Sequence, residues 1–329
     1  MMNNEEDNCV LLNSIDEVNL SHIPQSNNLT ILHQNIQGIS SNFDKFVTYL
    51  SCWNVRPAIV VLSEVWLDTD DQVSHYFIEG YEFYSHISTF TRATGIVVYY
   101  SSELVDFNCN LTDCELSGAD VLYLQCALSN YNFNLICLYR WHGFDCDRFL
   151  SSLDSVVARS TTCDTVLIGD VNINILINDD NKVDSYLEIL SCYGFEPVIN
   201  IPTRVTETTA TLIYHVFIRS RTFTHFVRGA VIETLIGDHR AVSLTLRSNT
   251  MSNIEGANSS VSGPANTSAS GSATANRIFV DGEDIKPLIF GNMKDLQQGQ
   301  LYDMKAVRRL TTRYGEKITI GLEKEHEIL

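Results

Sequence analysis

From Leu29 onward, short apolar runs alternate with polar turns, and this pattern limits the possible folds. The runs are rich in Val, Ile, Tyr and Phe and have the length of single strands. Several follow one another without an intervening helical segment, so we expect an α/β sandwich of mixed or antiparallel sheets with helices outside. The predicted strands cover residues 29–35, 58–64, 95–100, 121–128, 133–140, 165–170, 212–218 and 241–246.

Composition divides the chain into four segments. Residues 1–27 lack sustained periodicity, which predicts a flexible leader, and residues 28–247 hold the eight strands named above as one domain. Residues 248–276 are almost entirely Ser, Asn, Ala, Gly and Thr, a composition typical of flexible linkers. Residues 277–329 have apolar runs of their own, and their pattern from Tyr302 predicts strand, turn and strand. We therefore expect a short, separate β-rich segment at the C-terminal side, whose role stays open.

The charge distribution limits the classes of nucleic-acid-binding protein that fit the chain. The formal net charge is -18, and residues 1–276 hold 13 basic against 31 acidic residues. Proteins that hold nucleic acid mainly by neutralising many phosphates usually carry a wide basic surface. The composition disfavours that class, but it is compatible with a nuclease whose cleft is small and locally basic.

Composition also indicates where in the cell the protein is located. No apolar stretch approaches the roughly 20 residues of a membrane helix, and the acidic, polar start differs from a signal peptide. The nine cysteines form no C-x-x-C pair, which disfavours zinc and a disulfide framework. We therefore expect an intracellular protein of the cytoplasm or nucleus with no membrane partner, and the oligomeric state stays open.

Polar side chains follow several predicted strands at the point where each strand ends. Asn35 closes the first strand, and Glu64 follows an almost wholly apolar one. Asp170 and Asn172 leave a third strand two residues apart, just after a glycine that permits a tight turn. Strand ends are where α/β proteins place ligands, so these groups are candidates for one site. Taken singly, each is also compatible with a solvated turn.

Two more polar pairs extend this order: Tyr139-Arg140 ends a strand, and Asp238-His239 precedes the last one. In this order the motifs resemble the endonuclease/exonuclease/phosphatase superfamily, above all the endonuclease domain of non-long-terminal-repeat retrotransposons of the jockey and chicken-repeat type. The resemblance covers roughly residues 29–246. Four segments carry it: LSEVWL at 62–67 is similar to the family's LSETWL, and LYR at 138–140, PTR at 202–204 and TLI at 211–213 match its IYR, PTR and TLID.

The resemblance implies a four-layer α/β sandwich, with two mixed sheets packed face to face, that cuts phosphodiesters with Mg²⁺ or Mn²⁺. Nuclease sites hold Mg²⁺ with one or two carboxylates, water and phosphate. Glu64 would be the principal ligand, supported by Asn35, and Asp238 would complete the acidic site as a further ligand. Asp170 would orient and deprotonate the attacking water. His239, titrating near neutral pH, would donate to the phosphate oxyanion.

The same resemblance implies contacts with the substrate, which we expect to be DNA. Tyr139 would contact the phosphate or the leaving oxygen, and Asn172 would hold a phosphate oxygen. Arg140, Thr211 and Arg204 fall in the matched motifs and are expected to bind substrate. The implied catalytic residues are Asp170, His239, Tyr139, Asn172 and Asp238.

One position departs from the family in a way that bears on activity. The family's TLIDH reads Thr-Leu-Ile-Tyr-His here, so Tyr214 replaces the Asp that accepts a hydrogen bond from the catalytic His. Tyrosine is neutral and stabilises an imidazolium poorly. In serine proteases, neutralising the equivalent Asp costs about 10⁴ in turnover. By that analogy, the substitution is expected to impair catalysis.

Three functions stay open from the sequence. The first is a Mg²⁺-dependent endonuclease that nicks DNA and derives from a retrotransposon. The second is a catalytically inactive relic or binding module with the same fold, which Tyr214 and the acidic balance favour. The third is a phosphatase of the same superfamily acting on a small substrate; such an enzyme would show no salt-dependent affinity for DNA.

Overall fold

The structure is a computed structural model. It describes residues 9–22, 28–88, 93–102, 107–128, 131–160, 163–220, 227–234, 236 and 239–247, and the backbone of four short strands beyond residue 277. The chain divides into two compact units, Met1–Ala257 and Asn258–Leu329. The predicted linker at 248–276 lies outside the described residues.

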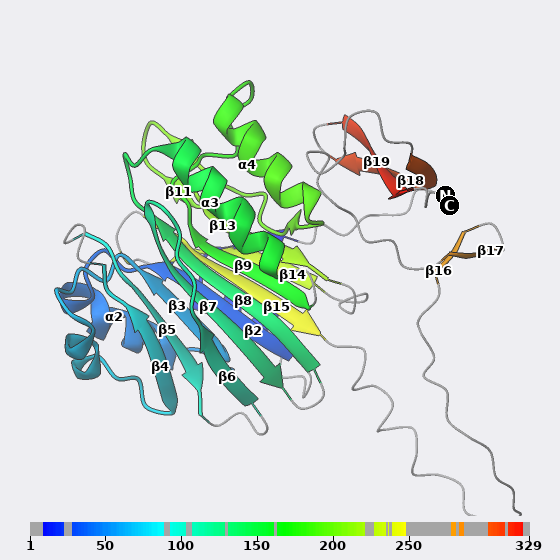
Figure 1. Cartoon of the computed structure of the whole chain (residues 1–329). Coiled ribbons are helices and arrows are strands. Elements are labelled where there is room, and N and C mark those ends of the chain that lie inside the picture. Colours follow the sequence, from blue (N-terminus) through cyan, green and yellow to red (C-terminus); the bar gives the residue numbers. More distant parts are fainter. Residues whose placement is uncertain are drawn as a thin grey trace, which may run out of the picture. The chain divides into compact units, whose positions relative to one another are not determined.

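Two mixed sheets form the body of the first unit (Figure 1). The first has seven strands in the order β1-β14-β15-β2-β3-β5-β4, and the second has six in the order β10-β13-β9-β8-β7-β6. The strands of the first sheet are β1 (Cys9–Leu12), β14 (Val227–Ile232), β15 (Ala241–Arg247), β2 (Asn28–Asn35), β3 (Ile59–Ser63), β5 (Ile96–Ser101) and β4 (Tyr81–His86). Those of the second are β10 (Glu196–Pro197), β13 (Tyr214–Arg219), β9 (Asp164–Asp170), β8 (Tyr131–Arg140), β7 (Ala119–Leu128) and β6 (Phe107–Thr112).

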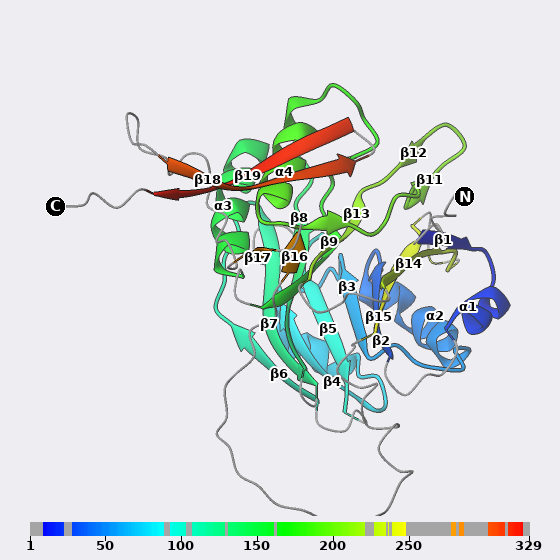
Figure 2. The same ribbon diagram turned by 90° about the vertical axis from the view of Figure 1, so that its right-hand side faces the viewer.

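Helices cover the outer faces of both sheets (Figures 1 and 2). Buried apolar side chains of α2 (Ile39–Ser51), such as Phe46 and Leu50, pack with alternate residues of β3 such as Val60. The other face of β3, including Val61, joins the core that the two sheets and the helices α3 (Cys146–Arg159) and α4 (Asn181–Cys192) share. This arrangement confirms the predicted four-layer sandwich.

The remaining elements of the first unit are short. They are α1 (Ile15–Ser21), the 3₁₀ helix η1 (Asp70–His75) and the hairpin of β11 (Arg204–Val205) with β12 (Ala210–Thr211). Among the described residues, no helix is both long and apolar enough to cross a membrane.

The prediction of a flexible leader over 1–27 is wrong for residues 9–22. Strand β1 pairs in parallel with β14, from Cys9 opposite Gly229 to Leu12 opposite Ile232. Helix α1 follows, and its first turn is capped by the Ser14 hydroxyl, which accepts the Glu17 N–H at 3.2 Å. A four-residue strand and a seven-residue helix are too short to show a period in the sequence, so the partner strand decides their structure.

The described residues of the second unit form two antiparallel pairs of strands, as expected for a β-rich segment. Strand β18 (Tyr302–Thr312) pairs antiparallel with β19 (Gly315–Lys324), and β16 (Ile278–Val280) pairs with β17 (Glu283–Ile285). The two strands of the pattern predicted from Tyr302 therefore match the backbone.

Candidate active site

Three strands from the two sheets bring polar groups together at their carboxyl ends. Strands β2 and β3 run parallel with Asn35 opposite Ser63, so Asn35 and Glu64 emerge at the same edge. Strand β9 of the other sheet ends at Asp170. The Asn35 side-chain N–H₂ donates to Glu64 Oε1 at 2.7 Å and to Asp170 Oδ2 at 2.9 Å. One buried amide thus bridges two carboxylates that are 106 positions apart in the chain.

The orientation of the Asn35 amide limits what it can offer to a cation. Its Oδ1 accepts the backbone N–H of Gln37 at 3.1 Å, so its nitrogen faces the two carboxylates. In this arrangement Asn35 orients Glu64 and Asp170, and the oxygen donors directed at the site are the carboxylates. Oxygen donors of this kind suit Mg²⁺. Among the described residues, no three His, Cys, Asp or Glu side chains cluster in a way that could hold a metal.

Both carboxyl groups have raised pKa values. Burial first, and then the negative charge of Glu64, raise the pKa of Asp170 to about 8. Burial likewise raises the pKa of Glu64, while hydrogen bonds from Asn35, Tyr139 and Trp66 and the charge of Arg204 oppose the rise. Two close carboxylates of low exposure would be stabilised as anions by a cation between them. The donor set therefore fits a divalent metal.

Backbone conformation at the site is constrained. Glu64 and Asn172 both lie in the left-handed region, with φ of 54° and 52°. The Asn172 N–H donates to Asp170 Oδ1 at 3.1 Å, and its side-chain amide donates to the Arg140 carbonyl at 2.8 Å. Non-glycine residues persist in this region only where surrounding contacts compensate the strain, and such positions concentrate at functional sites.

Tyr139 and Arg140 end β8 beside these groups but face different partners. The Tyr139 hydroxyl interacts with Glu64 and lies 3.3 Å from the Ala93 carbonyl; burial, followed by the nearby carboxylates, raises its pKa. Arg140 is buried and donates to the carbonyls of Val171, Asn172 and Phe144 at 3.1–3.4 Å. These contacts favour a structural role for Arg140, holding the loop after β9, over the predicted contact with substrate.

His239 lies at the same edge in a neutral state. Its Nε2 lies 2.7 Å from Gln37 Nε2, so the Gln37 amide donates and the imidazole accepts. Burial, and secondarily the positive charge of Arg204, lower the pKa of His239 to about 4. The expectation that His239 titrates near neutral pH is therefore wrong, because burial and a nearby positive charge both disfavour the imidazolium.

Tyr214 occupies the place that the motif predicts, beside His239. Its ring stacks on the imidazole with centroids 5.6 Å apart and planes at 21°. It also pairs with Asp170 in the β13–β9 register. The Tyr214 hydroxyl is buried and has no hydrogen-bond partner among the described residues. The predicted neighbourhood of Tyr214 and His239 is thus present, with an aromatic ring in place of a carboxylate.

The β11–β12 hairpin carries the two other predicted contacts. Arg204 pairs with Thr211 in the hairpin and with His239 in an isolated bridge. Its positive charge acts on Glu64, Asp170 and His239, so Arg204 lies close to the site. Thr203 anchors the base of the hairpin, because its Oγ1 accepts the N–H groups of Ile213 and Tyr214 at 3.1 Å. Asp238 lies outside the described residues.

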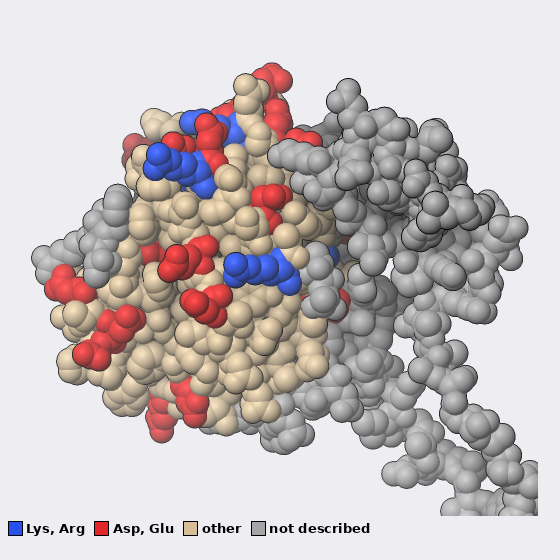
Figure 3. All heavy atoms as spheres, in the orientation of Figure 1, with Lys and Arg blue, Asp and Glu red and all other residues tan. Residues whose placement is uncertain are grey.

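Acidic and basic side chains are distributed differently on one face of the first unit. On the face shown in Figure 3, visible Asp and Glu side chains are spread widely, and Lys and Arg gather in few places. At the candidate site, Arg204 is a source of positive charge for a phosphate, and a bound cation would be another.

Comparison with known proteins rests on structure alone, since no protein-family model and no curated protein matches the sequence. Three solved structures with similar folds are a zebrafish (D. rerio) TDP2 humanized by 14 mutations, the AP endonuclease LMAP from Leishmania major and the endonuclease domain of TRAS1, a telomere-specific non-LTR retrotransposon. Their sequence identities are 16%, 14% and 13%, and their TM-scores 0.52, 0.56 and 0.54. The matches cover 67%, 69% and 67% of this chain and 99%, 90% and 99% of the respective structures.

This chain has the same fold as these three structures. The fold expected from the sequence motifs is therefore confirmed. At identities below 25%, the likeness establishes the architecture, whereas the activity has to be argued from the site itself.

Two residues of the site were not predicted from the sequence. Gln37 contacts His239 across 202 positions, and only the HQNIQG segment around Asn35 could have drawn attention to it. Trp66, with φ of 56° and 42% of its surface exposed, hydrogen-bonds to Glu64 and packs on Gly38. Trp66 belongs to the LSEVWL motif, but the motif alone does not predict what its side chain contacts.

Proposed function

We propose that the chain is a Mg²⁺-dependent phosphodiesterase that nicks DNA, derived from a retrotransposon endonuclease and slowed by Tyr214. The observation that carries the proposal is the Asn35 amide bridging Glu64 and Asp170. Burying two carboxylates side by side does not stabilise a fold, since each raises the free energy of the other's charged form. An enzyme that needs a metal ligand and a general base beside one phosphate requires this pair.

Each carboxylate has its own task in the proposal. Glu64 is the more exposed of the two and would hold the metal, with Asp238 as a further ligand; the metal would supply positive charge to the phosphate oxygens. Asp170 is almost fully buried and accepts from Asn35 and Asn172, so its orientation is fixed. A fixed carboxylate of raised pKa is suited to orient a water and accept its proton.

The substrate is assigned to neighbouring polar groups. Arg204 would neutralise a phosphate oxygen, and Asn172 and Thr211 would donate to others. Tyr139, close to Glu64, would donate to the phosphate or the leaving oxygen. His239 would hold the phosphate oxyanion through Nε2 after the Gln37 amide, which now donates to that atom, has moved away; as a neutral imidazole it would be a weaker donor than the imidazolium that the family's Asp would favour.

An alternative function has specific support. Tyr214 and the low pKa of His239 also suit a catalytically inactive relic that binds metal or nucleic acid without turnover. A small-substrate phosphatase finds no comparable support among the described residues.

The test is plasmid nicking with Mg²⁺ or Mn²⁺, comparing wild type with Glu64→Gln. Nicking by the wild type that falls at least 10³-fold in the variant would support the nuclease. A folded wild type without nicking, which still binds Mg²⁺ by calorimetry, would favour the relic. Equal activity in both proteins would point to a contaminating nuclease and refute the proposal.

A further inference from the structure

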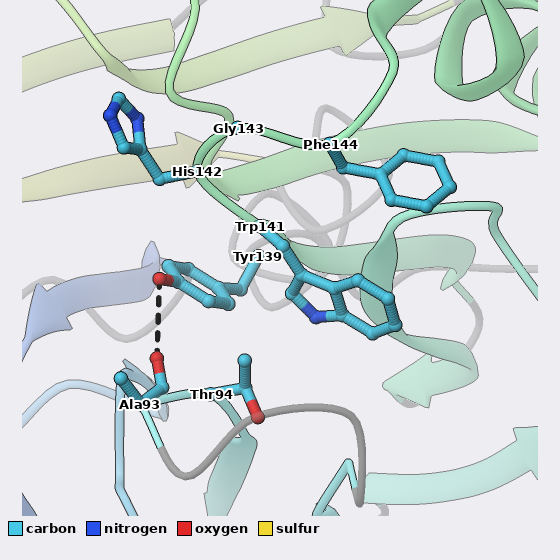
Figure 4. Close-up of a pocket in the computed structure, with 7 residues that line it drawn as sticks. All are labelled: Ala93, Thr94, Tyr139, Trp141, His142, Gly143 and Phe144. Carbon is cyan, nitrogen blue, oxygen red and sulfur yellow. Dashed lines mark hydrogen bonds between the residues drawn. The ribbon is translucent and has the colours of Figure 1, made fainter.

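A pocket opens beside the site, next to Tyr139 (Figure 4). Its volume is about 260 Å³. None of its lining side chains is Lys, Arg, Asp or Glu, in contrast to the acidic site next to it. The lining residues are Ala93, Thr94, Tyr139, Trp141, His142, Gly143 and Phe144.

Tyr139 is a wall shared by the pocket and the candidate active site. Its ring lines the pocket, and its hydroxyl reaches the Ala93 carbonyl on the opposite side (Figure 4). The same hydroxyl interacts with Glu64. A phosphate placed at Glu64 would therefore have the pocket within reach of the nucleoside attached to it.

Trp141, the other large aromatic wall, is held in place before any ligand binds. Its ring meets Phe144 edge-on, with centroids 5.8 Å apart and planes at 90°. Its backbone N–H donates to the Gly118 carbonyl at 2.9 Å. Phe144 in turn packs so closely on Gly118 that a Cβ there would lie 1.8 Å from the ring. The loop that carries Trp141 is thus fixed from two sides.

Asp120 ties the two sides of the pocket together. This buried carboxylate accepts the Gly95 N–H at 2.7 Å, next to the Ala93–Thr94 wall, and the Trp141 side chain lies close enough to lower its pKa against the effect of burial. It also pairs with Tyr139 in the β7–β8 register. Asp120 therefore lies next to all three walls, and its hydrogen bond to Gly95 fixes the backbone beside one of them, which helps to preorganise the pocket.

We propose that this pocket, the Trp141 pocket, receives one unstacked nucleobase of a nucleic-acid substrate. The inference rests on the proposed function, since the phosphate next to that base would lie at Glu64. The pocket is smaller than the roughly 300–1,000 Å³ that drug-sized ligands occupy, so one base fits better than a longer ligand. Aromatic walls without charge suit the π-face of a base, whereas a phosphate would need the positive charge that the lining lacks.

The proposal has a consequence for the choice of substrate. A base inside a duplex has to leave its stack to enter the pocket, and this step is least unfavourable in mispaired or single-stranded DNA. We therefore expect single-stranded or locally unpaired DNA to bind better than an intact duplex.

The test measures binding without turnover, in the Glu64→Gln background. The probes are a fluorescein-labelled strand of 12 thymidylates and a strand of 12 tetrahydrofuran phosphates, which has the same charge but no bases. Trp141→Ala should weaken binding of the thymidylate strand by about 5- to 150-fold and leave the baseless strand within twofold. Trp141→Phe should keep most of the affinity, and Phe77→Ala, at an exposed aromatic outside the pocket, should change nothing.

The outcomes separate this proposal from the proposed function. If the parent protein binds both probes equally and Trp141→Ala changes neither, the Trp141 pocket is refuted while DNA binding stands. If the folded parent binds neither probe at low salt, the DNA substrate and the pocket are both refuted. A selective loss of the thymidylate strand in Trp141→Ala, recovered in Trp141→Phe, supports the base pocket.

Discussion

The ring of Tyr214 lies nearly parallel to the imidazole of His239, 5.6 Å away between centroids. A carboxylate at this position would attract a proton to the imidazole. The tyrosine instead helps to bury it, and the pKa of His239 falls to about 4, with burial as the main cause. His239 is therefore neutral across the physiological pH range.

Tyr214→Asp should raise the rate of plasmid nicking by about 10²–10⁴, by analogy with the orienting Asp of serine proteases. The new carboxylate would face His239 and raise its pKa. The lost ring should cost stability, roughly 3–5 kcal/mol, so circular dichroism at 20 °C must show that the variant is folded. Tyr214→Phe is the matched control: it removes a buried hydroxyl without a partner, so nicking should stay unchanged and stability should stay equal or rise. Faster nicking by the phenylalanine variant would contradict this explanation.

Asn35→Ala should shift the acid limb of the pH–rate profile upward by about one unit. The amide donates to both carboxylates, and a hydrogen bond to a charged group contributes roughly 1.5–3 kcal/mol, or about one pKa unit or more. Without it, the pKa values of Glu64 and Asp170 rise further, so a higher pH is needed to ionise them. The measurement is the initial rate between pH 6 and pH 9, and an unmoved limb with a lower plateau would argue against this role of Asn35.

Affinity for Mg²⁺ alone should depend on pH. Without metal the pKa of Asp170 is about 8, so the carboxyl is mostly protonated at pH 7, and a nearby cation has to displace that proton. Below pH 8 the dissociation constant should therefore fall by up to about tenfold for each unit that pH rises. Isothermal titration calorimetry in buffers of different ionisation enthalpy measures both the constant and the proton released. Asp170→Asn should remove the proton release, and release that persists in this variant would assign the proton to another group.

His215 gives a pH dependence of stability that is separate from the site. Burial lowers its pKa to about 4, while its ring lies 2.9 Å from the Tyr186 hydroxyl and 3.2 Å from the Leu212 carbonyl. Between pH 6.5 and pH 4, His215 binds a proton in the unfolded chain but not in the folded chain. The free energy of unfolding therefore falls as pH drops through this range. This one group should cost roughly 2 kcal/mol between pH 7 and pH 5. Urea unfolding at both pH values should show a smaller loss for His215→Gln; equal losses would assign the effect elsewhere.

The sequence predicts the parts of the fold that repeat a local pattern. All eight predicted strands match observed ones to within a few residues, because each is a run of apolar residues bounded by turns. Among the strands that were missed, β4 and β6 bury few of their side chains and contain polar residues such as Glu82 and Asn108, and the apolar run of β14 is interrupted by Arg228 and Gly229. Their sheet partners, not their own composition, make them strands.

The site was predictable to the extent that strand ends carry it. Asn35, Glu64 and Asp170 stand out because polar groups close apolar runs, and the structure brings all three together. The protonation state of His239 could not be predicted, because it depends on burial and on Gln37, a contact between distant parts of the chain. Sequence motifs indicate which residues meet, whereas the local dielectric environment decides their charge.

Strand β1 limits how far the protein can be shortened from its N-terminal side. Cys9–Leu12 occupy the outer side of β14, and the Glu233 N–H donates to the Leu12 carbonyl at 2.9 Å. A version that starts after Leu12 would leave the backbone N–H and C=O groups of β14 without this neighbour. Such a bare edge can recruit a strand from another molecule, so the shortened protein should self-associate and precipitate as its concentration rises.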